Sequence, residues 1–124
     1  FHWSIWIEPK RAPDTGTSFA LTDSLPHASV TDPFGWRLDV MSYDSLPSRM
    51  FGRIMIGKVP EDLSKKDIEE TLKEVPLPSD PGSGVSDGVD WLKGALEVLQ
   101  DCGAAERFSI EAFMGDAMGN AVQW

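Results

Sequence analysis

The chain is poor in residues that cross-link proteins or bind metals. Cys102 is the only cysteine, and there are two histidines in 124 residues. One thiol cannot form an intramolecular disulfide, which removes the framework typical of small secreted domains, and these ligands are too few for a structural zinc site. The carboxylates match no calcium loop. We therefore expect no metal and no cofactor, with the reducing cytoplasm as the default location.

Long apolar runs and positive charge are also scarce. No run approaches the ~18 residues of a membrane-spanning helix, and no signal-peptide pattern is present. Eleven Lys and Arg stand against 20 Asp and Glu, a net charge of −9 that repels a phosphate backbone. We expect neither a membrane nor nucleic acid as a partner, and the sequence does not indicate an oligomeric state. Because the chain begins at Phe1 without a methionine, we expect an upstream piece.

Motifs of nucleophilic catalysis are absent too. No serine stands in a Gly-x-Ser-x-Gly elbow, and the glycine-rich stretch at 82–88 lacks the lysine of a phosphate-binding loop. Cys102 falls at the end of a predicted helix, and we interpret it as a small residue that is buried or half-buried. The sequence therefore lacks a complete catalytic constellation.

What the chain does have is an ordinary globular composition, with 41% hydrophobic and 25% charged residues. Its length predicts one domain spanning residues 1–124. The unusual feature is the set of five tryptophans, whose rings bury large areas but carry an N–H donor. They indicate either a core of bulky rings or an aromatic-lined pocket, and core packing is the simpler interpretation.

The first half of the chain reads as strands. Residues 1–8 alternate, with Trp3 and Ile5 on one face and Ser4 and Trp6 on the other. Further strands are predicted at 17–22, at 36–41 with Trp36, Leu38 and Val40 inward, and at 50–57, which is apolar on both faces like a central strand.

The second half reads as helices. Ser64 and Asp67 form a variant of the capping box at the start of the first helix, which prolines end after Val75. A second helix is predicted at 89–102, stopped by Gly103, and a third at 109–122 with a strong apolar period. The predicted fold class is therefore α+β, an antiparallel sheet of about four strands packed by two or three helices.

Histidine is the side chain that titrates near neutrality, so His2 and His27 are the first candidates for acid–base chemistry. His27 lies in a proline-flanked loop and reads as a solvated residue. His2 lies on the predicted strand face of Ser4 and Trp6, where a cleft could hold it. Asp90, in the first turn of the second helix, is the carboxylate that we pair with it.

Two segments resemble a known pattern: His2-Trp3 opening a strand, and residues 84–92, where a Gly/Asp-containing loop leads into the helix of Trp91. The chain resembles a group of small fungal proteins in which the second segment carries a cysteine, and through them the circularly permuted papain-like folds of the NlpC/P60 and LRAT-like groups. The resemblance implies a papain-like fold and a histidine role for His2. Where the pattern places its cysteine this chain has Gly88 and then Val89, which cannot act as nucleophiles.

We therefore hypothesise a small-molecule-binding domain, a papain-like fold without its nucleophile. Its aromatic cleft is expected to hold a ligand between Ser4, Trp6, Trp36, Trp91 and the helix start at Gly88, where free N–H groups would donate hydrogen bonds to a ligand oxygen. One alternative is a cofactor-free isomerase or cyclase of fungal specialised metabolism using His2 and Asp90 as catalytic residues. Another is a protein-interaction module using the Met- and Phe-rich last helix, a stripe that core packing explains more simply.

Overall fold

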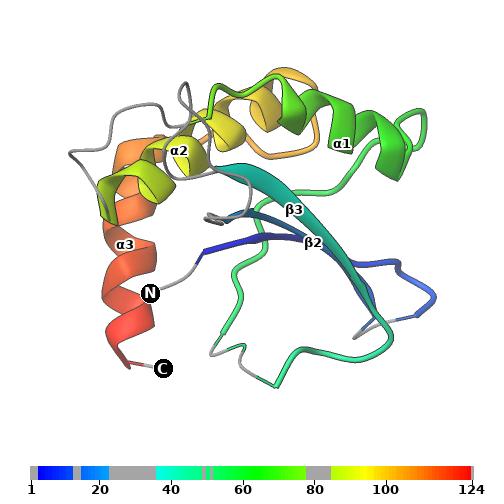
Figure 1. Cartoon of the computed structure of the whole chain (residues 1–124), viewed down its shortest axis with the longest axis horizontal. Helices are drawn as coiled ribbons and strands as arrows, with labels where there is room; N and C mark the ends of the chain where they lie inside the picture. Colours follow the sequence, from blue (N-terminus) through cyan, green and yellow to red (C-terminus); the bar gives the residue numbers. More distant parts are fainter. Residues whose placement is uncertain are drawn as a thin grey trace.

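The computed structural model describes residues 3–12, 15–22, 36–48, 50, 52–77 and 85–123, with only the backbone given for 85–88 and 121–123. Within these residues the fold is α+β: a three-stranded antiparallel sheet accompanied by three helices (Figure 1). The elements in chain order are β1 (Ile5–Ile7), β2 (Gly16–Thr22), β3 (Arg37–Tyr43), α1 (Lys65–Lys73), α2 (Val85–Asp101) and α3 (Ile110–Gln123).

The sheet has the order β1-β2-β3, with β2 in the centre and both pairs antiparallel. Ile5 pairs with Phe19, and Phe19 pairs with Val40. Directly opposed residues of neighbouring strands point to the same face, so these three side chains define one face of the sheet. Trp6 pairs with Ser18 and belongs to the other face.

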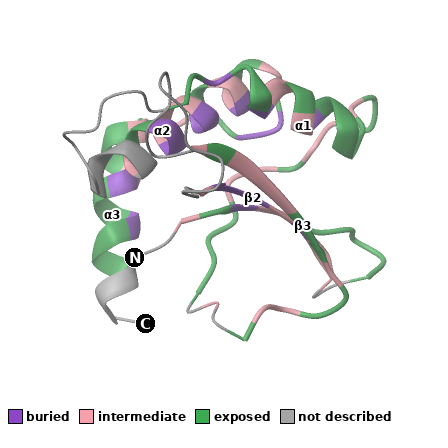
Figure 2. Cartoon of the chain, in the orientation of Figure 1, coloured by how far each residue is buried: buried purple, intermediate pink, exposed green. Residues whose placement is uncertain are grey.

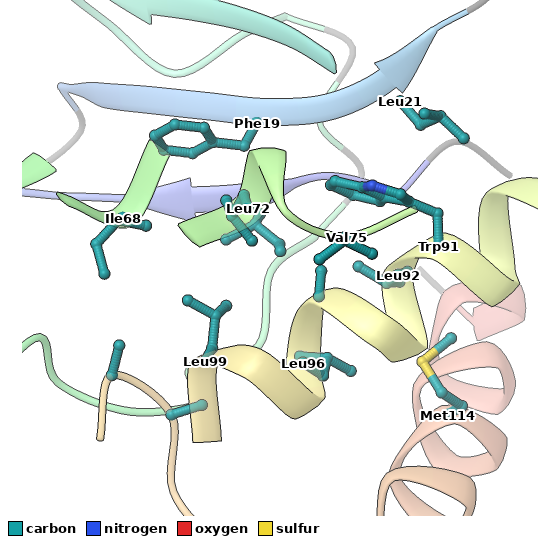
Figure 3. Packing of buried hydrophobic residues seen from close by; sticks show 14 residues of the cluster. Phe19, Leu21, Ile68, Leu72, Val75, Trp91, Leu92, Leu96, Leu99 and Met114 are labelled. Atoms are coloured by element: carbon teal, nitrogen blue, oxygen red, sulfur yellow. The ribbon is translucent and has the colours of Figure 1, made fainter. Parts of the chain in front are cut away.

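The core lies between the first of these faces and the helices. Phe19 from β2, Ile68 and Leu72 from α1, and Ala95 and Leu96 from α2 are almost fully buried. Figure 3 shows the labelled side chains of β2, α1 and α2 gathered between the sheet and α2, with Met114 extending from α3 next to α2. The buried residues of the helices accordingly lie on their inner sides (Figure 2).

The start of α1 follows from its sequence. The Oγ of Ser64 accepts a hydrogen bond from the Asp67 amide at 3.1 Å, and the Asp67 carboxylate accepts one from the Ser64 amide at 2.9 Å. Two amides that the helix cannot pair are thereby satisfied. The predicted capping box and helix are both confirmed.

The end of α2 is a Schellman motif. The amide of Ala104 donates to the carbonyl of Leu99 at 2.9 Å, and that of Gly103 donates to the carbonyl of Gln100 at 3.1 Å. Gly103 has a φ of 81°, the left-handed conformation that glycine adopts most readily. The Gln100 amide then donates to the carbonyls of Glu106 and Phe108, which fixes the chain between α2 and α3.

The predicted fourth strand is wrong for the residues that the structure describes within 50–57. Residues 52–57 are in neither a strand nor a helix, and Met55 is 84% exposed instead of buried between two layers. The segment is held by single contacts: the Glu106 amide donates to the Ile56 carbonyl at 2.8 Å, and Gly57 packs against the backbone of the connection between α2 and α3. Its apolar residues therefore do not indicate a central strand.

Two element boundaries also differ from prediction. β1 covers three residues, whereas the alternation extended over eight. α2 begins at Val85, four residues before the predicted start, so Gly88 lies within the helix. The amides left unpaired at a helix start are those of the N-cap and the three residues after it. In a helix that starts at Val85, the amide of Gly88 is the first that the helix itself pairs, so it is not free for a ligand.

Candidate functional site

Three tryptophans gather at one end of the helix-facing side of the sheet. Trp36 lies two residues before Leu38, which pairs with Leu21, and Trp3 lies two residues before Ile5, which pairs with Phe19. By the alternation of a strand, both tryptophans share the face of the core, and both pack against it.

Trp91 reaches the same end of the sheet from the second turn of α2, and Figure 3 shows its ring directed toward the sheet close to Leu21. We call this region, formed by Trp3, Leu21, Trp36 and Trp91, the tryptophan end. Trp3 and Trp36 are half-buried, so the region reaches the surface, whereas Trp91 is 3% exposed.

The indole nitrogen of Trp91 is the unusual polar atom of this region. It is buried, and among the described residues it has no hydrogen-bond acceptor. A buried donor without a partner costs about 1–3 kcal/mol, and most tryptophans in protein interiors place this N–H on an acceptor. The tryptophan end therefore contains a donor that a bound acceptor would satisfy.

The structure places Trp6 away from this region, on the opposite face of the sheet. Its ring lies over Gly16, where an added Cβ would approach the ring to 2.7 Å, and its centroid is 5.8 Å from that of Tyr43. Its Nε1 donates to Glu8 at 3.4 Å. Ser4 is exposed before β1. The expected grouping of Trp6 with Trp36 and Trp91 in one cleft is therefore not assembled.

The remaining predicted site residues do not form a described cluster. His2 and His27 lie outside the described residues, so the proposed pairing of His2 with Asp90 stays a prediction. Asp90 is exposed on the second turn of α2, and only the backbone of Gly88 is described. Within the described ranges no three His, Cys, Asp or Glu side chains come together in a way that could hold a metal ion.

The apolar stripe of α3 faces mainly inward. Met114 and Ala117 are buried, and Ile110 and Phe113 pack against the core, whereas Met118 is 44% exposed. Core packing therefore accounts for most of the stripe that suggested a protein-interaction surface. Cys102 is half-buried, as predicted, with its thiol directed to the carbonyl of Leu99.

Sequence reasoning did not include Trp3 in the site. The alternation of the first strand already placed it with Ile5, and therefore with the core, on the face opposite Ser4 and Trp6. What was missing was the knowledge of which face the helices cover. Trp36 and Trp91 were both expected as ligand-binding residues, and the structure brings them to the same end of the core.

The chain matches the family of unknown function DUF6914 over residues 1–113, and it belongs to this family. No curated protein and no solved structure matches it. Among the described residues, no helix has the length and apolar character needed to cross a membrane.

Proposed function

We propose that this member of the DUF6914 family is a small-molecule-binding domain that holds its ligand at the tryptophan end, without covalent chemistry. The observation that carries the proposal is the buried indole N–H of Trp91, which has no acceptor among the described residues. A ligand oxygen that accepts a hydrogen bond from this nitrogen would remove the cost of the unpaired donor. One directed hydrogen bond would therefore make the free energy of binding more favourable.

The surroundings of Trp91 define the kind of ligand. The half-buried rings of Trp3 and Trp36 and the side chain of Leu21 present mainly apolar surface. A charged ligand would lose hydration there without gaining a partner. The expected ligand is therefore neutral and largely apolar, with one carbonyl or ether oxygen.

The catalytic alternative has less support. Asp90, the carboxylate of the isomerase or cyclase hypothesis, is exposed to solvent on α2, and no described side chain joins it to form an acid–base pair. The papain-like fold also stays a prediction. Binding without turnover requires neither an acid–base pair nor a papain-like fold. It depends on the apolar side chains of the tryptophan end and on the indole N–H of Trp91.

Calorimetric titration with a small cyclic ketone such as cyclohexanone tests the proposal. The wild-type chain should bind it saturably, and Trp91→Phe, which keeps an aromatic ring but removes the N–H, should weaken binding about tenfold, the equivalent of about 1.4 kcal/mol for one hydrogen bond.

Trp6→Phe is the matched comparison, because it removes the same N–H from the opposite face of the sheet. A loss of affinity in Trp6→Phe as large as in Trp91→Phe would place the ligand on that face and contradict the proposal. Equal binding by wild type and both variants would also contradict it.

A further inference from the structure

β3 is an edge strand without the usual protection of an edge. It pairs with β2 in continuous register over all seven of its residues, and in the described part of the chain β2 is its only strand partner. Its sequence contains neither proline nor lysine, which often keep natural edge strands from pairing further. The backbone groups on its outer edge can therefore receive another strand.

β1, at the other edge of the sheet, is better protected. It has only three residues, and Pro9 follows two positions after its end. An ion pair ties the next residue, Glu8, to Arg53 of the segment before α1, with 2.6 Å between Oε1 and Nη1. A further strand is therefore accommodated more readily at β3 than at β1.

The helix-facing side of β3 is incompletely covered. Trp36, Leu38 and Val40 lie on this side, and all three are half-buried. The residues of β2 that pair with the last two, Leu21 and Phe19, are 7% and 0% exposed. No residue of β3 is buried, whereas four residues of β2 are (Figure 2). A strand added at β3 would take more of this apolar surface out of water.

The opposite side of β3 carries two charges in a self-complementary order. Arg37 and Asp39 are two positions apart, so they share this side of the strand. When a second β3 is placed antiparallel to the first with Leu38 on a two-fold axis, Arg37 of each copy lies opposite Asp39 of the other. The same register places Trp36 opposite Val40, so that apolar side chains meet on one side and opposite charges on the other.

The neighbouring registers match less well. An axis at Arg37 or at Asp39 places that charge opposite its own copy, which is destabilising. An axis at Val40 places Arg37 opposite Tyr43 and Asp39 opposite Met41, so neither charge gains a partner. Charge complementarity therefore favours the axis at Leu38.

We propose that the chain forms a homodimer in which β3 pairs antiparallel with β3 of a second copy, on a two-fold axis at Leu38. Backbone hydrogen bonds between the two edges join the two sheets into one, and the two pairs of Arg37 with Asp39 set the register. The pairing requires no ligand at the tryptophan end, so it stands or falls separately from the proposed function.

Sedimentation at increasing concentrations of the chain tests the dimer. The mass should rise from that of one chain toward that of two, and amide hydrogen exchange at alternate residues of β3 should slow as the dimer forms, because their amides become paired. A chain that stays monomeric up to about 1 mM would overturn the proposal. So would a dimer whose formation leaves hydrogen exchange in β3 unchanged, because its interface would lie elsewhere.

Charge reversal tests the register. Arg37→Asp and Asp39→Arg should each weaken self-association at least about tenfold, because two attractive pairs become repulsive. When the two variants are mixed in equal amounts, they should associate with each other about as tightly as the wild type does, since each pair again joins opposite charges.

Lys66→Glu is the matched control for Arg37→Asp, because it changes the net charge by the same amount at an exposed position of α1. It should leave the dimer intact. Equal weakening by Lys66→Glu and Arg37→Asp would show a general charge effect and overturn the proposal. Mixed variants that associate no better than either variant alone would overturn it as well.

Discussion

At the scale of single residues, Gly103 has the clearest conformational requirement. Its φ of 81° ends α2, and a Cβ in this region costs about 1–2 kcal/mol for an ordinary residue. Gly103→Ala should therefore lower the free energy of unfolding by about 1–2 kcal/mol, measured by urea denaturation. Gly103→Asn should lose less, because asparagine tolerates left-handed backbone.

Gly119 provides the control for this prediction. It lies in α3, and an added Cβ would meet no atom within 4 Å. Gly119→Ala should raise the free energy of unfolding by up to about 1 kcal/mol, because alanine has the higher helix propensity. Similar losses at Gly103 and Gly119 would argue against a special backbone requirement at the end of α2.

Asp67 carries a pH dependence of a predictable sign. Hydrogen bonds from the amide of Ser64, and then from its hydroxyl, lower the pKa of Asp67 below its ordinary value of 3.8. A carboxylate with a depressed pKa in the folded state stabilises the fold above its unfolded pKa, and this contribution disappears as the pH falls through the folded pKa.

The stability difference between the wild type and Asp67→Asn should therefore be constant near neutral pH and shrink as the pH falls below about 4. Denaturation curves across this range measure it. A difference that stays constant down to about pH 2, or that grows as the pH falls, would show that the carboxylate is not stabilised by the cap.

At the scale of elements, the segment of Gly57 depends on a close backbone contact. A Cβ added at Gly57 would lie 2.7 Å from the carbonyl oxygen of Ala104 and the Cα of Ala105, both backbone atoms that cannot rotate away. Gly57→Ala should cost about 1–3 kcal/mol through this overlap. It should also speed hydrogen exchange at the Glu106 amide, which bonds to Ile56.

Gly115→Ala is the comparison for Gly57, since an added Cβ at Gly115 meets nothing within 4 Å. It should leave hydrogen exchange at the Glu106 amide unchanged. Unchanged exchange in Gly57→Ala as well would mean that the segment is not held by this contact.

The elements that sequence patterns predicted well are those that local rules determine. The capping residues Ser64 and Asp67, the stop at Gly103 and the alternation of β3 all act within a few residues. The segment at 50–57 was mispredicted because an apolar pattern cannot supply a strand partner, which depends on distant parts of the chain. Among the described residues, its hydrogen bond from Glu106 joins positions fifty apart in sequence.

At the scale of the whole molecule, the sequence predicted several residues of the candidate site but not which of them lie together. Strand alternation correctly separated Trp3 from Trp6, but alternation does not reveal which face the helices cover. The structure shows the helices on the face of Phe19, which brings Trp36 and Trp91 into one cluster and leaves Trp6 outside it. The part of the site that involves His2 lies outside the described residues.

The unpaired donor of Trp91 also predicts an unusual mutational pattern. Trp91→Ala should lower the free energy of unfolding by about 3–5 kcal/mol, because it empties a buried ring site. Trp91→Phe should change it by no more than about 1 kcal/mol, since the lost packing is offset by removal of the unsatisfied N–H. Urea denaturation of both variants measures the contrast, and a loss of similar size in both would show that the N–H is satisfied in the folded protein.

The central claim is that the Trp91 indole N–H donates a hydrogen bond to a ligand oxygen, and the nitrogen-15 signal of this indole reports the bond most directly. On addition of cyclohexanone, that signal should shift saturably, while cyclohexane, which has the same ring size but no acceptor, should leave it nearly unchanged. An unmoved Trp91 signal with the ketone, or an equal shift with the hydrocarbon, would contradict the account.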